Sequence, residues 1–517
     1  LFDVPIYREI DSDNLDNEIP RLTPPRADRS RFHQIIQGHE VGTNGKLVSA
    51  WSDIVSFLLT LKESEFETFF DFVTQKVEIT ILYIPDTEDA NAVFEALNAR
   101  GKPLEDIDLI RNHIYSYFSR DNDAQQYEAV HSSIEDTLAA LRSAKRAQDY
   151  FRCYLQNRYG YLQKTRFYRN ARVAILHASS DRTSGQQAKN YVLALVNDLT
   201  NLKNVELFRT IFSTNPNPDF LLDFNRASRT NTSKRNLSVF LDELRGYSVT
   251  YPLLFALLRR FTSIASYQRA TRRPVAVAVH RAIADLTTFI MRTSFVEGKF
   301  EPSRVEPALA NCAQRIASGI GSTDAEDLDI LDDLSACDTS QIMSEANFID
   351  RLKNARLTDR RRAKRLLFGV NGQQQRDATA LSYQGCSVEH ILPQSAHYWP
   401  GWREFGDSGP DLSDWVPRLG NLTLLGHNDN YSRGRFNASF ESKRPVFADS
   451  PFTITKDLAR HSQWSPAAVD ARSQDIARMA ARVWRFSRPA PVAGTGLAAQ
   501  STGGGSDRLS RSTKKPR

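Results

Sequence analysis

Two short apolar stretches decide how the C-terminal part of this chain folds: SYQGCSVEHILPQ at 382–394 and LGNLTLLG at 419–426. Both are rich in branched apolar residues and are bounded by Gly, Pro or polar residues, which is the pattern of short β-strands. The second stretch is followed by HNDNYSRGRFNASFESKR at 427–444, which indicates a loop that turns into a helix. We therefore predict two strands and a helix in this region.

Four polar residues lie at the ends of these predicted elements. Glu389 and His390 end the first strand, Asn421 starts the second, and Asn430 lies where the helix begins. This order resembles the ββα-metal arrangement of HNH nucleases. Carboxylate and amide oxygens suit a hard divalent cation, so Glu389 and Asn430 are expected to bind Mg²⁺ or Mn²⁺, which would neutralise charge on a scissile phosphate. His390 is expected to act as general base, with Asn421 orienting its imidazole by a hydrogen bond.

Other interpretations of these residues stay open. An isolated Glu-His pair is common and most histidines take no part in catalysis, so the prediction rests on the order of the whole set. A zinc site formed by His390, His397 and His427 is the alternative metal site. It is disfavoured because the sequence has no local cysteine pair and no helix that places two of these histidines four residues apart.

The same region resembles the C-terminal nuclease domain of the GmrSD-type restriction enzymes. The resemblance is carried by EHILPQ (389–394), LGNLTLL (419–425), Asn430 and the F-x-x-K pattern from Phe440 to Lys443. A further stretch, WSPAAVDARSQDIARMAARVW at 464–484, resembles the W…I…R…W helix that closes this domain, with Val469 where Ile is usual. These enzymes are modification-dependent and act in phage defence, and the related phosphorothioate-sensing SspE proteins share the layout.

A second resemblance lies upstream. VFEALNARGKPLEDIDLIRNHIY at 93–115 is similar to the signature of the family's N-terminal domain, which has a ParB/sulfiredoxin-like core. The family's DGQQR motif, tied to nucleotide hydrolysis, is absent, and NGQQQR at 371–376 lies in the wrong domain. We therefore expect an incomplete N-terminal domain, with GTP or another NTP used only if its missing part is present. Asn98, Arg100 and Gly101 are candidates for the remnant of a nucleotide site; alternatively, Asn98 and Gly101 only cap one helix and turn into the next.

The resemblance implies a metal-dependent DNA endonuclease or nickase of a bacterial antiviral restriction system, acting on modified phage DNA. It assigns Glu389 and Asn430 to the metal, His390 to the general base, Asn421 to a supporting role and Lys443 to a phosphate contact. An inactive or regulatory DNA-binding fragment that lacks its NTPase half is the alternative. An RNA nuclease is a third interpretation, disfavoured by the lack of RNA-binding aromatic motifs. Oligomeric state is open, although cutting both strands would usually need two nuclease domains.

Secondary-structure patterns along the rest of the chain are mostly helical. Residues 50–72 have apolar side chains at helical spacing, 77–85 is rich in β-branched residues, and 89–98 again indicates a helix. From about 120 to 365 nearly all of the chain has helical patterns. Residues 487–517 are rich in Gly, Ser and Pro with few large apolar residues, so we expect disorder there.

We expect a mostly α, multi-domain protein, since its 517 residues correspond to two to four domains at roughly 100–200 residues each. The expected divisions are a truncated α/β ParB-like part (1–119), a helical middle domain (120–375), a ββα-metal (HNH) nuclease domain embedded in helices (376–486) and a disordered basic tail (487–517).

Charge is distributed unevenly. The net charge of +6 and pI of about 9.0 suggest an acidic partner such as nucleic acid, but six of the 67 basic residues and one of the 61 acidic residues lie in 487–517, which leaves +1 for the rest. Residues 323–341 carry seven acids and no base, whereas 351–365 carry eight bases and one acid. The basic block is either a DNA-tracking helix or a solvated helix face partly neutralised by the acidic block.

The remaining composition favours a cytoplasmic protein. The four cysteines are far apart and form no CxxC pair, which fits a reducing compartment. No apolar stretch approaches the roughly 20 residues of a membrane span, so no membrane association is expected. The first residues, LFDVPIYREI, lack the basic and then apolar run of a secretory signal.

Overall fold

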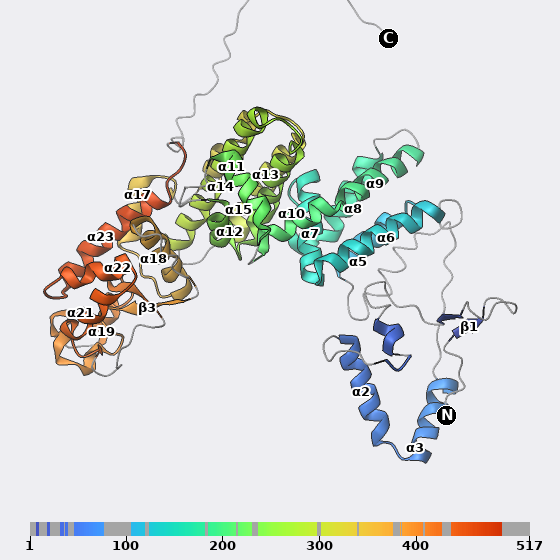
Figure 1. Ribbon diagram of the computed structural model, residues 1–517, viewed down its shortest axis with the longest axis horizontal. Coiled ribbons are helices and arrows are strands. Elements are labelled where there is room, and N and C mark those ends of the chain that lie inside the picture. Colours follow the sequence, from blue (N-terminus) through green and yellow to red (C-terminus); the bar gives the residue numbers. More distant parts are fainter. Residues whose placement is uncertain are drawn as a thin grey trace, which may run out of the picture. The chain divides into compact units, whose positions relative to one another are not determined.

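The computed structural model describes residues 7–9, 18–20, 31–35, 37–39, 46–76, 105–118, 124–180, 185–213, 216–229, 236–296, 301–338, 341–375, 383, 385–406, 409–426 and 436–488. Within them the chain is mostly helical, which confirms the expected fold class at that level (Figure 1). Several predictions lie outside these residues: the strand at 77–85, the helix at 89–98, the remnant nucleotide site (Asn98, Arg100, Gly101), His427, Asn430 and most of the tail. The ParB-like fold of the N-terminal part stays a prediction.

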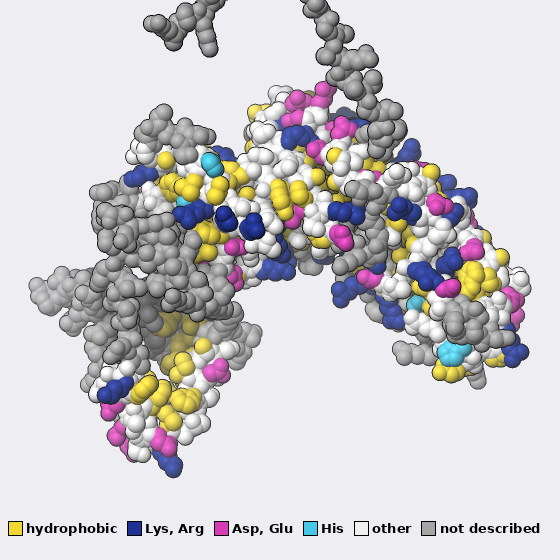
Figure 2. Space-filling model, turned by 180° about the vertical axis from the view of Figure 1, so that it is seen from behind, with side chains coloured by type: hydrophobic (Ala, Val, Ile, Leu, Met, Phe, Trp, Pro, Cys, Tyr) yellow, Lys and Arg dark blue, Asp and Glu magenta, His cyan; other side chains and the backbone are white. Residues whose placement is uncertain are grey.

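The N-terminal part has a small sheet and a helical hairpin. β1 (Tyr7–Glu9) pairs antiparallel with β2 (Glu18–Pro20). α2 (Lys46–Thr60), α3 (Glu63–Asp71) and the π-helical turn η1 (Phe72–Lys76) follow. The prediction of one continuous helix at 50–72 is therefore wrong. The backbone of Lys62 is extended, and its N–H donates to Glu65 Oε2 at 2.9 Å. This capping bond marks the start of a second helix. Apolar side chains of this hairpin are exposed (Figure 2).

Contacts divide the chain into two compact units. The first comprises Leu1–Thr287 and Lys299–Asp329, and the second comprises Thr288–Gly298 and Ile330–Arg517. The predicted domain boundaries stay predictions. The first unit contains α5 (Asp106–Tyr115), α6 (Ala124–Leu141), α7 (Ala144–Tyr159), α8 (Phe167–Ser180), α9 (Gly185–Leu199), α10 (Leu202–Phe212), α11 (Pro218–Ser228), α12 (Leu237–Leu244), α13 (Tyr251–Ser263), most of α14 (Arg269–Val296) and α15 (Pro302–Ser318).

The core of the first unit is centred on α13, whose residues 251–261 are all buried. An aromatic cluster joins this helix to its neighbours: the ring of Tyr150 lies 5.2 Å from that of Phe208 and 5.9 Å from that of Phe255. Such tilted and edge-on aromatic pairs add to the stabilisation that comes from burying apolar area.

α14 is 28 residues long and is apolar enough to span a membrane by length and composition. The helical patterns at 120–365 predicted a helix in this region, but no apolar stretch of membrane-spanning length was expected there. Its apolar window is 72% buried inside the protein, and it carries the buried charged residues Asp285 and Arg292. Burial against neighbouring helices therefore explains its apolar character, as in a core helix of a globular unit.

The second unit contains the two strands predicted at 382–394 and 419–426. β3 (Cys386–His390) pairs antiparallel with β4 (Leu422–Gly426). The same unit also contains the helices α16 (Leu331–Ala336), α17 (Glu345–Lys353), α18 (Arg360–Gln374), α19 (Gly409–Trp415), α21 (Phe440–Asp449), α22 (Thr453–Lys456), α23 (Pro466–Val483) and the short 3-10 helices η5 (Ala396–Tyr398), η6 (Pro400–Phe405), η7 (Leu419–Asn421) and η8 (Asp457–Arg460).

β4 is the buried strand of the hairpin, since Leu422 to Leu425 are all inaccessible. On the edge of β4 that points away from β3, Thr455 supplies hydrogen bonds to the backbone. Its hydroxyl donates to Leu424 O at 2.6 Å and accepts from Leu424 N at 3.3 Å. A side chain on α22 thus takes the place of a further strand, as a buried sheet edge requires.

α23 packs closely over the start of β4. The buried guanidinium of Arg472 donates to Gly420 O at 2.6 Å and to Leu422 O at 2.7 Å. Gly420 lies so close to α23 that a Cβ would overlap Val469 O, and its N–H donates to Ser473 Oγ at 2.8 Å. Glycine is therefore required at this position by a close helix approach.

Candidate functional site

The candidate site is built where β3 ends. In the hairpin register, Glu389 lies opposite Thr423 and His390 lies opposite Leu422. Val388 and His390 both line one cavity, whereas Glu389 between them does not. This is the alternation of side chains along a strand. The two adjacent residues that the sequence singled out therefore project toward opposite faces of β3.

Lys443 on α21 contacts the Glu389 face. Its ammonium donates to Glu389 Oε1 and to His390 O, both at 2.6 Å, and lies 4.5 Å from the centre of the Phe436 ring. The lysine is fully buried. Burial lowers its pKa, an effect that the neighbouring Glu389 opposes. A phosphate contact by this ammonium would therefore require the ion pair to open.

Asn421 fixes the turn that follows His390. Its side-chain oxygen accepts from Leu392 N at 2.6 Å and from Trp464 Nε1 at 3.3 Å. Its amide nitrogen donates to Leu392 O at 3.0 Å and to Val416 O at 3.1 Å. The Asn421 side chain is completely buried, and it holds backbone groups close to His390. Among the described residues, it makes no hydrogen bond to the His390 imidazole, although one was expected from the sequence.

A cavity of about 430 Å³ lies on the other face of β3. His390 lines it together with Arg360, the first residue of α18, and with His397. The pKa of His390 is lowered to about 4, first by burial and then by the positive charges of Arg360 and Lys443. The imidazole is therefore neutral at pH 7 and can accept a proton.

The described residues fit a divalent metal only in part. Glu389 supplies one carboxylate, whose side chain is 20% exposed and whose Oε1 is paired with Lys443. Its Oε2 has no hydrogen-bond partner among the described residues. The part of the chain that the structure describes contains no cluster of three or more His, Cys, Asp or Glu residues suited to a metal. The second proposed oxygen ligand, Asn430, and the third histidine of the alternative zinc set, His427, lie outside it.

Sequence reasoning missed Arg360 as a site residue. The basic block at 351–365 was recognised, but nothing in the local pattern distinguished this arginine from its neighbours. Arg360 lies beside β3 only because the fold packs the start of α18 against a strand that comes later in the chain.

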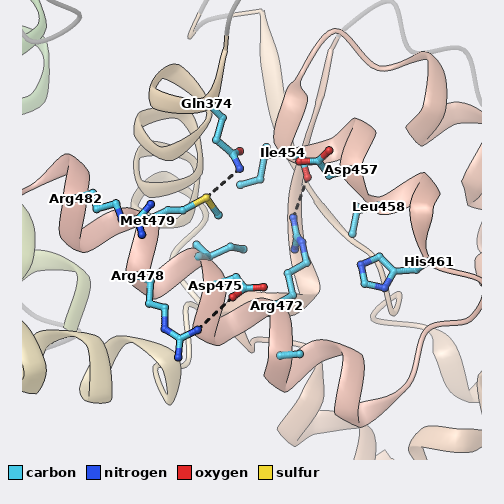
Figure 3. Close-up of a pocket in the computed structure, with 12 residues that line it drawn as sticks. Gln374, Ile454, Asp457, Leu458, His461, Arg472, Asp475, Arg478, Met479 and Arg482 are labelled. Atoms are coloured by element: carbon cyan, nitrogen blue, oxygen red, sulfur yellow. Dashed lines mark hydrogen bonds and ion pairs between the residues drawn. The ribbon is translucent and has the colours of Figure 1, made fainter.

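A second cavity of the same unit, about 450 Å³, lies beside α23 (Figure 3). It shares no lining residue with the His390 cavity. Several of its charged side chains are engaged with the protein: Arg472 donates to Ile454 O at 3.3 Å, and Arg478 pairs with Asp475 at 3.7 Å. Burial lowers the pKa of Arg472 to about 9. These contacts indicate a structural role for this region.

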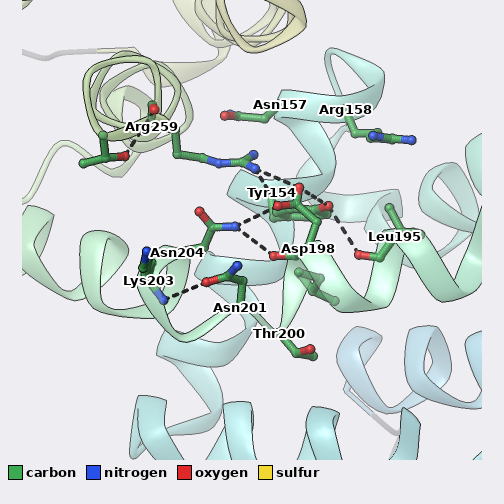
Figure 4. A network of polar contacts seen from close by, with 12 residues as sticks. Tyr154, Asn157, Arg158, Leu195, Asp198, Thr200, Asn201, Lys203, Asn204 and Arg259 are labelled. Atoms are coloured by element: carbon green, nitrogen blue, oxygen red, sulfur yellow. Dashed lines mark hydrogen bonds and ion pairs between the residues drawn. The ribbon is translucent and has the colours of Figure 1, made fainter. Parts of the chain in front are cut away.

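The first unit has its own polar network, centred on the half-buried carboxylate of Asp198 (Figure 4). Arg259 donates to both carboxylate oxygens at 2.9 and 2.7 Å, Tyr154 donates to Oδ2 at 2.8 Å, and Asn204 donates to Oδ1 at 3.1 Å. Burial raises the pKa of Asp198, but these donors together lower it below its ordinary value. A carboxylate satisfied by so many donors is a structural anchor between helices.

Comparison with known families identifies one region of the chain. Residues 342–479 match the family model described as GmrSD restriction endonucleases, C-terminal domain. This segment begins just before α17, runs into α23 and includes Glu389, His390 and Lys443. Comparison with curated proteins gives no match. The similarity confirms the C-terminal resemblance and supports a restriction endonuclease with DNA as substrate.

Proposed function

We propose that this protein is a metal-dependent DNA endonuclease or nickase of a bacterial antiviral restriction system, acting on modified phage DNA. The observation that carries the proposal is the placement of His390 in the segment similar to restriction endonucleases: a neutral imidazole at the end of a strand, lining a cavity.

His390 is the proposed general base of an HNH-type reaction. Its neutral imidazole takes the proton of the water that attacks the phosphodiester, a role that contributes roughly 10²–10⁴ in rate. Asn421 is a positioning residue, because two of its four hydrogen bonds hold the backbone of Leu392, which follows His390, and the other two tie it to Val416 O and Trp464. The ion pair of Lys443 with Glu389 and the bond to His390 O restrain the same strand end.

Glu389 and Asn430 are the proposed ligands of Mg²⁺ or Mn²⁺, because carboxylate and amide oxygens are the donors that these ions prefer. A bound ion would neutralise charge on the scissile phosphate and on the leaving oxygen. Use of GTP or another NTP through Asn98, Arg100 and Gly101 is proposed only for a chain that also carries the nucleotide motif.

The test is a nicking assay on supercoiled plasmid and on a panel of differently modified phage DNAs, with Mg²⁺ or Mn²⁺ and with EDTA, with and without GTP. We expect cleavage of at least one DNA, loss of cleavage in EDTA, and a drop of at least about 100-fold in His390→Ala. His177→Ala, an exposed histidine of α8, is the matched control. Full cleavage by a folded His390→Ala protein, checked by circular dichroism, contradicts the assignment.

A further inference from the structure

We infer that Arg360 binds a backbone phosphate of the nucleic acid beside His390, in the cavity that both residues line. This inference rests on the proposed function, because it assigns a substrate contact to the same site. It gives Arg360, and not Lys443, the phosphate contact of the site.

The start of α18 places this arginine. Asp359 caps the helix: its Oδ1 accepts from Arg361 N at 2.8 Å and from Arg362 N at 3.3 Å. The cap fixes Arg360 as the first helical residue, at the end of the helix that lies beside the cavity. Because the cap already occupies these backbone donors, an anion there is recognised by the guanidinium.

Other basic residues of the block at 351–365 are engaged with the protein. Arg356 pairs with Asp414, and Arg362 donates to Ser294 O at 3.1 Å. Lys364 lies 4.6 Å from the centre of the Tyr383 ring. By contrast, the exposed guanidinium of Arg360 has no hydrogen bond or ion pair within the described part of the chain. It is therefore a cation at the cavity that is available to a ligand.

The remaining lining residues suit a sugar-phosphate. No Asp or Glu is among the described residues that line the cavity, so no carboxylate of the lining repels an anion. Thr358 and Gln394 add a hydroxyl and an amide, and Leu357 and Leu412 add apolar surface. The volume of about 430 Å³ lies toward the lower end of ligand sites, which run from roughly 300 to 1,000 Å³. It accommodates one nucleotide unit, and a guanidinium can bind two oxygens of its phosphate at once.

Binding is measured without catalysis, so that the result does not depend on cleavage. Fluorescence anisotropy of a labelled DNA duplex, and of the same sequence as RNA, is recorded in EDTA across a salt series, with the full chain carrying His390→Ala. We expect Arg360→Gln to weaken DNA binding roughly tenfold and to reduce the slope of log K against log salt by about one, as loss of one phosphate contact does. Arg360→Lys is expected to recover part of the affinity.

Arg361→Gln is the matched control, because this exposed arginine is the next residue and does not line the cavity. It is expected to change binding less than about threefold, and inorganic phosphate is expected to compete better against the parent protein than against Arg360→Gln. Unchanged binding in a folded Arg360→Gln protein, or an equal loss in Arg361→Gln, overturns the inference. Tighter binding of the RNA, again dependent on Arg360, supports the phosphate site but changes its substrate.

Failure of this inference differs from failure of the proposed function. Binding that depends on Arg360 in a protein that cuts no DNA under any condition contradicts the nuclease and leaves the phosphate site standing. Cleavage by a His390-intact Arg360→Gln protein with unchanged KM contradicts the phosphate site and leaves the nuclease standing.

Discussion

The buried ammonium of Lys443 lies 2.6 Å from Oε1 of Glu389 and joins α21 to the end of β3. The two residues are 54 positions apart in the sequence. Their contact buries the ammonium of Lys443 within the segment similar to restriction endonucleases, and it connects the candidate site on β3 to α21.

This ion pair predicts a stability effect. Lys443→Met removes the partner of a largely buried carboxylate and of His390 O, so we expect a loss of roughly 3 kcal/mol in the free energy of unfolding. Urea denaturation measures it. The double variant Glu389→Gln/Lys443→Met should recover part of the loss, since no charge is left unpaired. A double variant as unstable as Lys443→Met alone would contradict the pairing.

Acid sensitivity follows from the lowered pKa of His390. In the unfolded chain its pKa is 6.5, and in the folded protein it is about 4. As pH falls below 6.5, the unfolded state takes up the proton first. The contribution of His390 to the free energy of unfolding is therefore complete above pH 6.5 and is lost progressively as pH falls to about 4. We expect a loss of up to about 3 kcal/mol from this group. Denaturation of the parent and of His390→Gln between about pH 7.5 and pH 4.5 should show a flatter dependence for the variant.

Asn421 should affect stability and activity together. Asn421→Ala removes the acceptor of Leu392 N–H and the donor to the carbonyls of Leu392 and Val416. Each buried backbone group left without its partner costs roughly 1–3 kcal/mol. We expect lower unfolding free energy and lower nicking rate, measured on the same preparation. His390→Ala is the comparison, because it should lose activity while remaining stable at pH 7.5. An Asn421→Ala protein of normal stability with no activity would instead indicate a direct catalytic role.

Two glycines provide a matched test of the close approach of α23. Gly420→Ala places a methyl group against Val469 O and Ser473, so we expect a loss of about 3 kcal/mol. Gly372→Ala on α18 meets nothing within 4 Å and should stabilise the helix by up to about 1 kcal/mol. Thermal or urea denaturation of both variants checks the contrast. Similar values for the two would show that α23 can move away from η7.

Local patterns were sufficient for some features of the site. Branched apolar residues between turn residues predicted both strands of the hairpin, and β3 and β4 are present where they were expected. The pattern also placed Glu389 and His390 at the end of the first strand. These predictions succeeded because strand propensity, turn residues and the period of two along a strand depend on neighbouring residues.

Apolar periodicity along the chain did not predict other features. The helix predicted at 50–72 is interrupted at Lys62, where the backbone is extended and a local capping bond starts a new helix. α14 matches a membrane span in length and composition, which was not recognised from the sequence, and its 72% burial in the structure indicates a core helix. Asn430 and the nucleotide residues Asn98, Arg100 and Gly101 lie outside the described residues and stay predictions.

By itself, the sequence determined a mostly helical chain, two short strands of which the first ends in Glu389 and His390, and a resemblance to restriction endonucleases that the match at 342–479 supports. Only the tertiary structure decided the partners of these residues: Lys443 on Glu389, backbone groups on Asn421, and Arg360 beside His390. The physical reason is that charge and residue type are local properties, whereas burial and pairing arise when segments far apart in the chain pack together.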